Sequence, residues 1–205
     1  MLTQVGDANS VEMTVTGTFN TAVSSQFGNG NTTEMTMSGD ANDATTYQEG
    51  NGNLTITSQD GILNSATINT IGDSNASGAF QSGFINEAEV NVVGEYSLGA
   101  AEQTGFANYA LVDNDGYGHY AWATQSGDFN VTGIFQSGEM HTSELTVDGY
   151  SNFTVSSQTG GSNEIQATVS GEWNNAEIYQ AGDSNYSLVD QAGYANNAII
   201  ETDGL

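Results

Sequence analysis

The chain has 205 residues, with 25 acidic residues and 26 glycines but no Lys, Arg, Cys or Pro. A formal net charge of −25 argues against nucleic acids and anionic membranes as partners, because both would be repelled. The lack of Cys excludes disulfides and Cys-based metal sites, and no apolar run of the sequence is long enough to span a bilayer.

A glycine recurs every 11 residues along the whole chain, without an insertion or a deletion. A fixed short period of this kind indicates a repeat architecture, in which each unit stacks on the next. A glycine that always falls in the same phase suits a turn that needs a positive φ or a close approach of two backbones. The predicted turn glycines are Gly6, Gly17, Gly28, Gly39, Gly50, Gly61, Gly72, Gly83, Gly94, Gly105, Gly116, Gly127, Gly138, Gly149, Gly160, Gly171, Gly182, Gly193 and Gly204.

Each 11-residue unit is expected to form one strand with a buried face. Asn stands three residues after 15 of the first 18 glycines, and Gln stands two residues before 11 of the 19 glycines. Since successive strand residues point to opposite faces, these amides share a face with the small or apolar residues between them, such as Asn64, Ala66 and Ile68. None of the 25 acids falls on this face, so the alternation predicts a strand with one side in a core.

One unit cannot bury its own face, but two units that face each other can. We therefore expect an all-β fold, a two-sheet parallel β-solenoid in which each rung has 22 residues and two strands of about seven residues. Gly6 to Gly204 span 198 residues, or about nine rungs, and a rung spacing of ~4.8 Å gives cross-β, amyloid-type stacking over ~43 Å. Residues 1–205 are expected to be a single domain of 11-residue half-repeats without a linker.

Along the chain, the volume of the middle inward residue is predicted to alternate between the two sheets. In the N-terminal units, Met13 is followed at the same position of the next unit by Ser24. In the central units the order is reversed, since Ala101 is followed by Val112. Such compensation is what a thin, close-packed core between two sheets requires.

The inward amides need partners, because a buried amide without hydrogen bonds is costly. In stacked rungs each inward Asn or Gln lies above the equivalent residue of the next rung, so the side-chain amides are expected to donate and accept along the axis as a ladder. The predicted ladder residues are Gln4, Asn9, Gln26, Asn31, Gln48, Asn53, Gln59, Asn64, Gln81, Asn86, Gln103, Asn108, Gln125, Asn130, Gln158, Asn163, Gln180, Asn185, Gln191 and Asn196.

The repeat resembles the curlin repeat of the major curli subunit, in which a Gln, two glycines and an Asn stand at this spacing. Gln26, Gly28, Gly30 and Asn31 match its central part, and related units follow over the whole chain. Curlins are secreted bacterial amyloids that nucleate on the cell surface and form biofilm matrix. The resemblance therefore implies a structural subunit of an extracellular, curli-like functional amyloid fibre, with roles in biofilm matrix, cell adhesion and surface attachment.

The expected partners follow from this resemblance and from the ends of the repeat. The repeat stays in phase from Gln4 to Gly204, so exposed strand edges at both ends are expected to template further copies in a head-to-tail fibre. A cell-surface nucleator and a secretion machinery are the other implied partners, whereas nucleic acid and membrane insertion are not expected. Catalytic, cofactor and metal sites are not expected either, apart from loose surface binding of divalent cations.

Other solenoid proteins fit the sequence less well. An ice-binding face would need outward Thr ladders, but one such column changes from Thr36 through Ser58 to Phe80. Calcium-binding β-rolls have a nine-residue period, whereas the period here is 11. The alternative to a fibre subunit is a non-polymerising extracellular β-solenoid, used as an adhesin or a stalk, in which atypical capping repeats would be expected at the ends.

The two histidines, His119 and His141, lie 22 residues apart at the Asn position and are expected to stack on adjacent rungs. Stacked imidazoles can share a metal ion, but substitution for Asn in the column is the preferred interpretation. An enzyme acting on acidic polysaccharides would need a cationic group to stabilise developing charge, and the chain has no Lys or Arg. We therefore expect no enzymatic activity.

Overall fold

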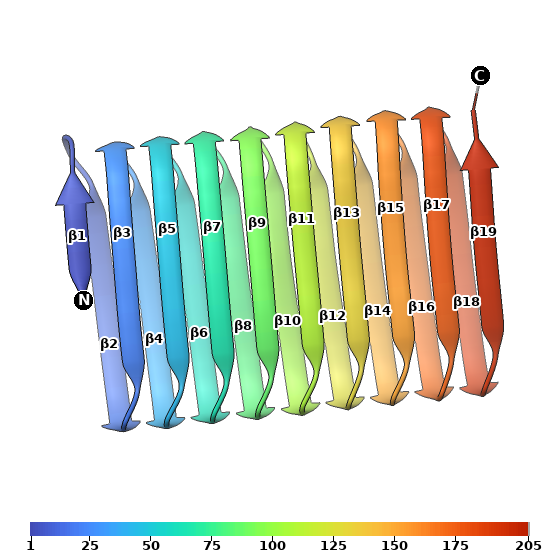
Figure 1. The fold of residues 1–205 in the computed structure, drawn as a ribbon, viewed down its shortest axis with the longest axis horizontal. Helices are drawn as coiled ribbons and strands as arrows, with labels where there is room; N and C mark the ends of the chain where they lie inside the picture. The colour runs from blue at the N-terminus through green and yellow to red at the C-terminus, as the bar shows by residue number, and fades with distance from the viewer. Residues whose placement is uncertain (205) are drawn as a thin grey trace.

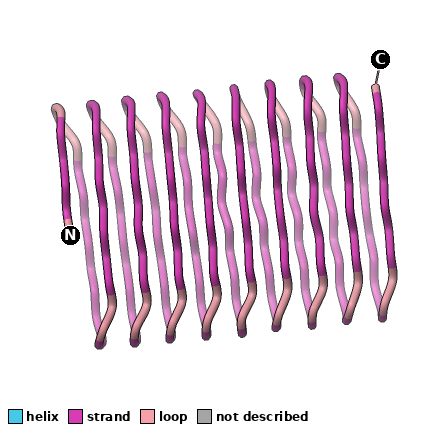
Figure 2. Tube along the Cα trace, in the orientation of Figure 1, coloured by secondary structure: helices cyan, strands magenta, loops and turns pink. Residues whose placement is uncertain are grey.

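Residues 1–204 are described by a computed structural model, and all their regular structure is β (Figure 1). Nineteen strands wind into a solenoid of about nine turns with about 22 residues per turn, which confirms the predicted fold class. The strands occupy two layers, and the turns gather along the two long edges (Figure 2). The described residues contain no helix that is long and apolar enough to cross a membrane.

The odd-numbered strands form a ten-stranded sheet, the odd sheet, and the even-numbered strands form a nine-stranded sheet, the even sheet. The odd sheet consists of β1 (Leu2–Val5), β3 (Thr21–Asn29), β5 (Asp43–Asn51), β7 (Ser65–Asp73), β9 (Glu87–Glu95), β11 (Tyr109–Tyr117), β13 (Val131–Glu139), β15 (Phe153–Gly161), β17 (Asn175–Asp183) and β19 (Asn197–Asp203). The even sheet consists of β2 (Ser10–Thr18), β4 (Thr32–Asp40), β6 (Leu54–Ile62), β8 (Ala76–Phe84), β10 (Leu98–Phe106), β12 (Tyr120–Asp128), β14 (Thr142–Tyr150), β16 (Glu164–Glu172) and β18 (Tyr186–Tyr194).

Neighbouring strands of a sheet are parallel and pair in a register of 22 residues. Equivalent positions of the repeat are therefore direct neighbours, as Gln103 is of Gln125 and Gly105 is of Gly127. A slip of one residue would turn the apolar side chains of a strand towards solvent, so the alternating pattern of the sequence fixes this register.

The strands are longer and the turns are shorter than the sequence predicted. A full strand has nine residues rather than seven, and only two residues, such as Ala41 and Asn42, separate it from the next strand. The predicted turn glycines therefore need a correction, because most of them occupy the next-to-last position of a strand, as Gly39 does in β4. The left-handed residue of the turn is the second residue after the glycine, with a φ of 57° at Ala41.

Glycine is required inside the strand because the neighbouring rung approaches it closely. Gly105 has a φ of 118°, and a Cβ atom added to it would lie 2.1 Å from the carbonyl oxygen of Gly127. Gly193 differs, because no described strand lies beyond it, and the nearest atom to its added Cβ is Nδ2 of Asn196 at 3.4 Å. Positive φ and close backbone approach thus act together at the inner glycines.

The inward residues of the two sheets form a thin core. The main apolar cluster extends from Ala66 to Val189, and a small cluster of Met35, Met37 and Ala44 lies nearer the N terminus. Polar residues of the Asn and Gln columns are buried on either side of these apolar residues. None of the acidic side chains is among the buried residues, so all the formal negative charge of the side chains lies outside the core.

Candidate functional site

The Asn side chains at the turns bind the backbone more than they bind one another. Nδ2 of Asn108 donates to the carbonyl oxygens of Thr104, at 3.2 Å, and of Gly127 in the next rung, at 2.7 Å. Its Oδ1 accepts the backbone N–H of Asn130 at 3.0 Å. Direct amide-to-amide bonds occur only in the middle of this column, as from Asn130 Nδ2 to Asn108 Oδ1 at 3.2 Å. The expected side-chain ladder is therefore corrected, for Asn, to one that runs mainly through the backbone.

The Gln side chains do bind one another along the axis. Nε2 of Gln81 donates to Oε1 of Gln103, and Nε2 of Gln103 donates to Oε1 of Gln125, both at 2.9 Å. Nε2 of Gln103 also donates to a backbone carbonyl of the facing sheet, that of Glu87, at 2.8 Å. Three such runs occur, namely Gln4–Gln26–Gln48, Gln59–Gln81–Gln103–Gln125 and Gln136–Gln158–Gln180.

The Gln runs change sheet along the solenoid, since the first and third lie in the odd sheet and the second lies in the even sheet. Each change leaves an amide without a donor from the preceding rung. Oε1 of Gln59 and Oε1 of Gln136 are buried and accept no hydrogen bond. Oδ1 of Asn114, which precedes Gln136 in the odd sheet, is likewise unbonded. The changes of sheet are therefore weak points of the polar core, alongside buried hydroxyl groups such as those of Ser24 and Thr46 that are also unbonded.

The two histidines take the place of Asn and make the same kind of hydrogen bonds. Nδ1 of His119 accepts the backbone N–H of His141 at 3.3 Å, and its Nε2 lies 3.1 Å from the carbonyl oxygen of Asp115. This arrangement fits a neutral ring with the proton on Nε2. Burial is the main cause that lowers the pKa of both histidines below the usual value, which keeps the rings neutral.

The predicted Asn residues lie in two columns, one along each long edge, and six further residues make equivalent contacts. In five of the six cases the residue is an Asn, and the Gln position two residues before the glycine of the same 11-residue unit holds another residue. The sixth is a Gln, and the Asn position of its unit holds His141. The prediction omitted them because it paired an Asn with a Gln, although the phase alone would have found them. They are Asn20, Asn42, Asn75, Asn152, Asn174 and Gln136.

The acidic residues are distributed over the surface of the solenoid, outside the core. Burial, and then the charges of Asp115 and Glu89, raise the pKa of Asp113 above its usual value. Hydrogen bonds from the hydroxyl and the backbone N–H of Thr18 lower the pKa of Asp40. Within residues 1–204, no three His or acidic side chains are grouped so that they could hold a metal ion.

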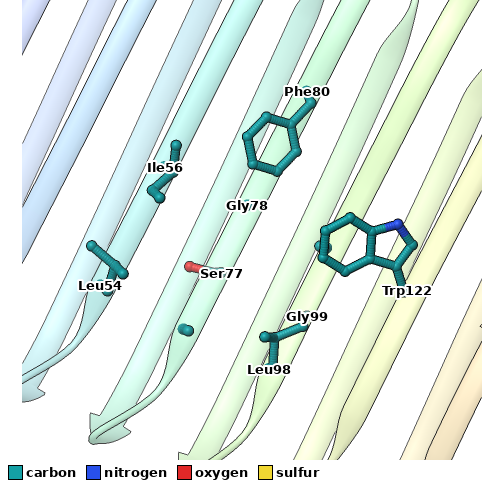
Figure 3. A pocket seen from close by; sticks show the side chains of 10 residues that line it. Leu54, Ile56, Ser77, Gly78, Phe80, Leu98, Gly99 and Trp122 are labelled. Atoms are coloured by element: carbon teal, nitrogen blue, oxygen red, sulfur yellow. The ribbon is translucent and has the colours of Figure 1, made fainter.

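A shallow hollow of about 250 Å³ lies on the outer face of the even sheet (Figure 3). The small residues Gly78 and Ala100 leave room between the larger side chains of Ile56, Phe80 and Trp122. None of the residues that line the hollow is acidic, basic or a histidine. The hollow therefore offers no side chain for acid–base catalysis.

The two ends of the solenoid carry complementary hydrogen-bonding groups. Between inner rungs, Oδ1 of the turn Asn accepts the backbone N–H of the residue 22 positions later, and Ser97 Oγ, His119 Nδ1 and His141 Nδ1 do so where Asn is replaced. Asn185 and Asn196 have no following rung within residues 1–204 to supply that N–H, and Asn9 and Asn20 have no preceding rung to accept theirs. The core is also open at the first rung, where the inward side chain of Val15 is 44% exposed.

The last rungs of the solenoid are the part that matches a known family. Residues 171–204, from the end of β16 through β19, match the family model described as curlin associated repeat. No curated protein gives a significant match to the chain. The matched segment has the same 11-residue period and the same Asn and Gln positions as the rest of the chain. Residues 171–204 thus resemble the curlin associated repeat, and the match supports the resemblance of this β-solenoid to the curlin family.

Proposed function

We propose that the chain is a structural subunit of an extracellular, curli-like amyloid fibre, in which copies stack head to tail on a bacterial surface. Its roles are cohesion of a biofilm matrix, adhesion and surface attachment. The curlin associated repeat at residues 171–204 and the solenoid fold, which are structural rather than catalytic, support this function. A secretion machinery and a surface nucleator are its further partners, and it has neither enzymatic activity nor a cofactor.

The observation that carries the proposal is the match between the two ends. If the 22-residue register of the inner rungs continues into a second copy, Asn9 of that copy follows Asn185, and Asn20 follows Asn196. The two backbone N–H groups then meet the two free Oδ1 atoms, as the N–H groups of Asn31 and Asn42 meet Oδ1 of Asn9 and Asn20. Parallel strands with open edges are templates for the addition of further copies.

The same register has a consequence for the junction between copies. Residues 1–6 of the added copy fall on the position that residues 199–204 of the preceding copy hold in the odd sheet. Only one of these segments can stay there. β1 pairs with its neighbour through four residues and β19 through seven, so we expect β1 to be displaced when copies join.

Gly193 provides a sharp test, because it is the strand glycine that a second copy would cover. In one chain, an added Cβ at Gly193 meets only Nδ2 of Asn196, at 3.4 Å. In a stack it would meet the carbonyl oxygen of Gly17 of the next copy, at the ~2 Å seen for Gly105 and Gly127. Gly193→Ala should therefore retain the β-sheet circular dichroism of the original chain but fail to extend preformed fibres.

Two further variants make this experiment decisive. Asn196→Ala removes a free Oδ1 without introducing backbone strain and should slow extension. Gly118→Ala adds a methyl group at a positive φ where the nearest atom, Cγ of Met140, is 3.5 Å away, so it should extend fibres normally.

Fibres of the original chain should diffract at ~4.8 and ~10 Å. An original chain that stays monomeric at high concentration with fibre fragments present would instead favour the adhesin or stalk.

A further inference from the structure

The two long edges of the solenoid differ in chemistry. At the lower edge of Figure 1, each even strand passes to the following odd strand. Over six consecutive rungs, from the end of β8 to the end of β18, each of these connections carries one aromatic residue, either as the last residue of the strand or as the first of the turn. We call this set the aromatic edge: Phe84, Phe106, Phe129, Tyr150, Trp173 and Tyr194.

The aromatic edge is a continuous line of rings from Phe84 to Trp173, half-buried at Phe84 and Phe106 and exposed from Phe129 onwards. From Phe84 to Trp173, the ring centroids of successive residues are 5.5, 5.1, 5.6 and 5.8 Å apart. The last three pairs meet edge to face, which is a preferred geometry for aromatic rings. Even so, Trp173 is 55% exposed and Tyr194 is 70% exposed. Contact between neighbouring rungs therefore leaves much of the aromatic surface in water.

The opposite edge is more polar. There, where odd strands pass to even strands, the first turn residue is mostly Gly or Ser, and the residue before it is often acidic. At the same two positions, the large side chains of this edge are Tyr96, Tyr117 and Met140, and all three are exposed. Along the six rungs of the aromatic edge, Asp128 and Glu172 are the acidic residues at the equivalent positions. Carboxylates are thus sparser at the aromatic edge than at the opposite edge, where Asp73, Glu95, Glu139 and Asp183 stand at the equivalent positions.

The backbone shows that two of the exposed aromatic residues, Phe129 and Trp173, are placed at a cost. The first turn residue is left-handed at both edges, with φ of 58° at Phe129 and 59° at Trp173. Bulky residues seldom adopt this conformation, whereas Gly, Asn and Ser residues accept it more readily. The opposite edge uses Ser at φ of 59° in Ser74 and Ser184. Phe129 and Trp173 thus carry this strain without being buried, as Tyr96 and Met140 do at the opposite edge.

We propose that the aromatic edge is the surface by which two copies of the solenoid pair side by side. Where the paired copies are subunits of a fibre, this inference rests on the proposed function. The exposed apolar area of the edge is on the order of 500 Å² per copy, since a full aromatic side chain has about 150–250 Å². Two copies then bury about the 1,000 Å² that a specific interface needs, and every further subunit of a filament, ~43 Å along, adds the same area again.

A second copy is the occupant that the charge distribution favours. Two chains of net charge −25 can approach closely only where carboxylates are sparse, and the aromatic edge is such a place. In a pair with a two-fold axis between Phe129 and Tyr150, those two residues face each other, and Phe106 faces Trp173. Each aromatic residue of one copy then meets an aromatic residue of the other, in antiparallel filaments.

The test compares two double variants that remove similar apolar groups at the same backbone position. Phe129→Ser with Trp173→Ser alters the aromatic edge, and Tyr96→Ser with Met140→Ser alters the opposite edge. Both should fold, because Ser already occupies this left-handed position in the chain. The measurement is the mass per length of fibres by scanning transmission electron microscopy. Original and control fibres should have two chains per ~43 Å, and the aromatic-edge variant should have half of that.

Each outcome separates the pairing from polymerisation. Single filaments of the original chain, or paired filaments of the aromatic-edge variant, would overturn the pairing while leaving the fibre in place. If single filaments of the original chain, but not of the aromatic-edge variant, were retained on an octyl-coated surface, the aromatic edge would bind an apolar surface instead of a second copy. If no fibres form, the proposed function fails. The side-by-side pairing is then tested separately, by sedimentation of the concentrated, folded chain. Dimers lost only in the aromatic-edge variant would support pairing, and monomers throughout would overturn it.

Discussion

His119 accepts the backbone N–H of His141 through its Nδ1 atom, and the two imidazole rings lie parallel, with centroids 5.1 Å apart. Nδ1 of His141 in turn accepts the backbone N–H of Asn163 at 3.2 Å. Protonation of either Nδ1 would set two N–H groups against each other and break the column at that rung. The neutral ring is therefore part of the fold, and its titration should be visible in the stability of the protein.

We expect the histidine pair to destabilise the solenoid in mild acid. Burial lowers the folded-state pKa of both rings below the ~6.5 of an unfolded chain, so the unfolded chain binds more protons below that pH. The stability that the pair contributes is complete above pH ~6.5 and is lost as the pH falls towards the folded pKa. Denaturant unfolding at about pH 7 and pH 5 measures the free energy of unfolding of each chain. Between these two pH values, the double variant His119→Asn/His141→Asn should lose less of it than the original chain. An equal loss in both chains would contradict this account.

Two glycines with positive φ should respond differently to alanine. Gly105→Ala places a methyl group 2.1 Å from the carbonyl oxygen of Gly127, so it should cost about 3 kcal/mol or more in free energy of unfolding. Gly118→Ala has open space, and alanine already occupies the equivalent left-handed position as Ala107, so the cost should be about 1 kcal/mol. Equal losses of unfolding free energy in the two variants would show that the positive φ, rather than contact with the next rung, requires glycine at these positions.

The buried face should reject a charge that the outer face accepts. Ala110 is completely buried, and Ala110→Asp would place a carboxylate in the core, where an unpaired charge costs about 3–5 kcal/mol. Thr104 points outwards from β10, so Thr104→Asp should change stability by about 0.5 kcal/mol. Circular dichroism and denaturant titration of the two variants measure the difference, and similar results would mean that the assignment of the faces is wrong.

A longer amide at Asn114 should repair the start of the third Gln run. Asn114→Gln extends the amide by one methylene group towards Oε1 of Gln136, which is buried and unbonded. A hydrogen bond to this one unsatisfied oxygen is worth about 1–3 kcal/mol, and the extra volume offsets part of it, so we expect a gain of about 1 kcal/mol. Asn114→Leu has a similar size without the amide and should give no gain. A stabilising Leu would attribute the effect to packing alone.

Removal of the first strand should not impair assembly. Residues 1–6 compete with residues 199–204 for one position at the proposed junction, so a chain that lacks residues 1–6 should extend fibre fragments at least as fast as the original. The rate of seeded extension at equal monomer concentration measures this. Slower extension by the shortened chain, with unchanged circular dichroism, would place the junction in another register.

The sequence specified most of the fold because the repeat is strict. A constant 11-residue phase and a strand period of two determine which residues point inwards, and Met13 with Ser24 already showed that the two sheets share one core volume. The length of the strands was harder to predict. Glycine usually signals a turn, but Gly39 continues the strand because its neighbour in the next rung leaves no room for a side chain.

Two features of the site depended on three-dimensional geometry. The Asn columns looked like side-chain ladders, but Nδ2 of Asn108 lies within reach of the carbonyl of Gly127, and the backbone takes most of its hydrogen bonds. The aromatic edge was not apparent as a column because Phe106 is the last residue of a strand whereas Phe129 is the first of a turn. Only the fold shows that these two rings are 5.1 Å apart.

The acidic side chains, all of which lie outside the core, would give a fibre the properties of a polyelectrolyte. Twenty-five charges over nine rungs, or ~43 Å, amount to one charge per ~1.7 Å, which is the axial charge density of duplex DNA. Such a fibre condenses counterions along its whole length. A network of these fibres would swell as a hydrogel at low ionic strength and contract when divalent cations replace monovalent ones, so the ions around the cell would set the water content of the matrix.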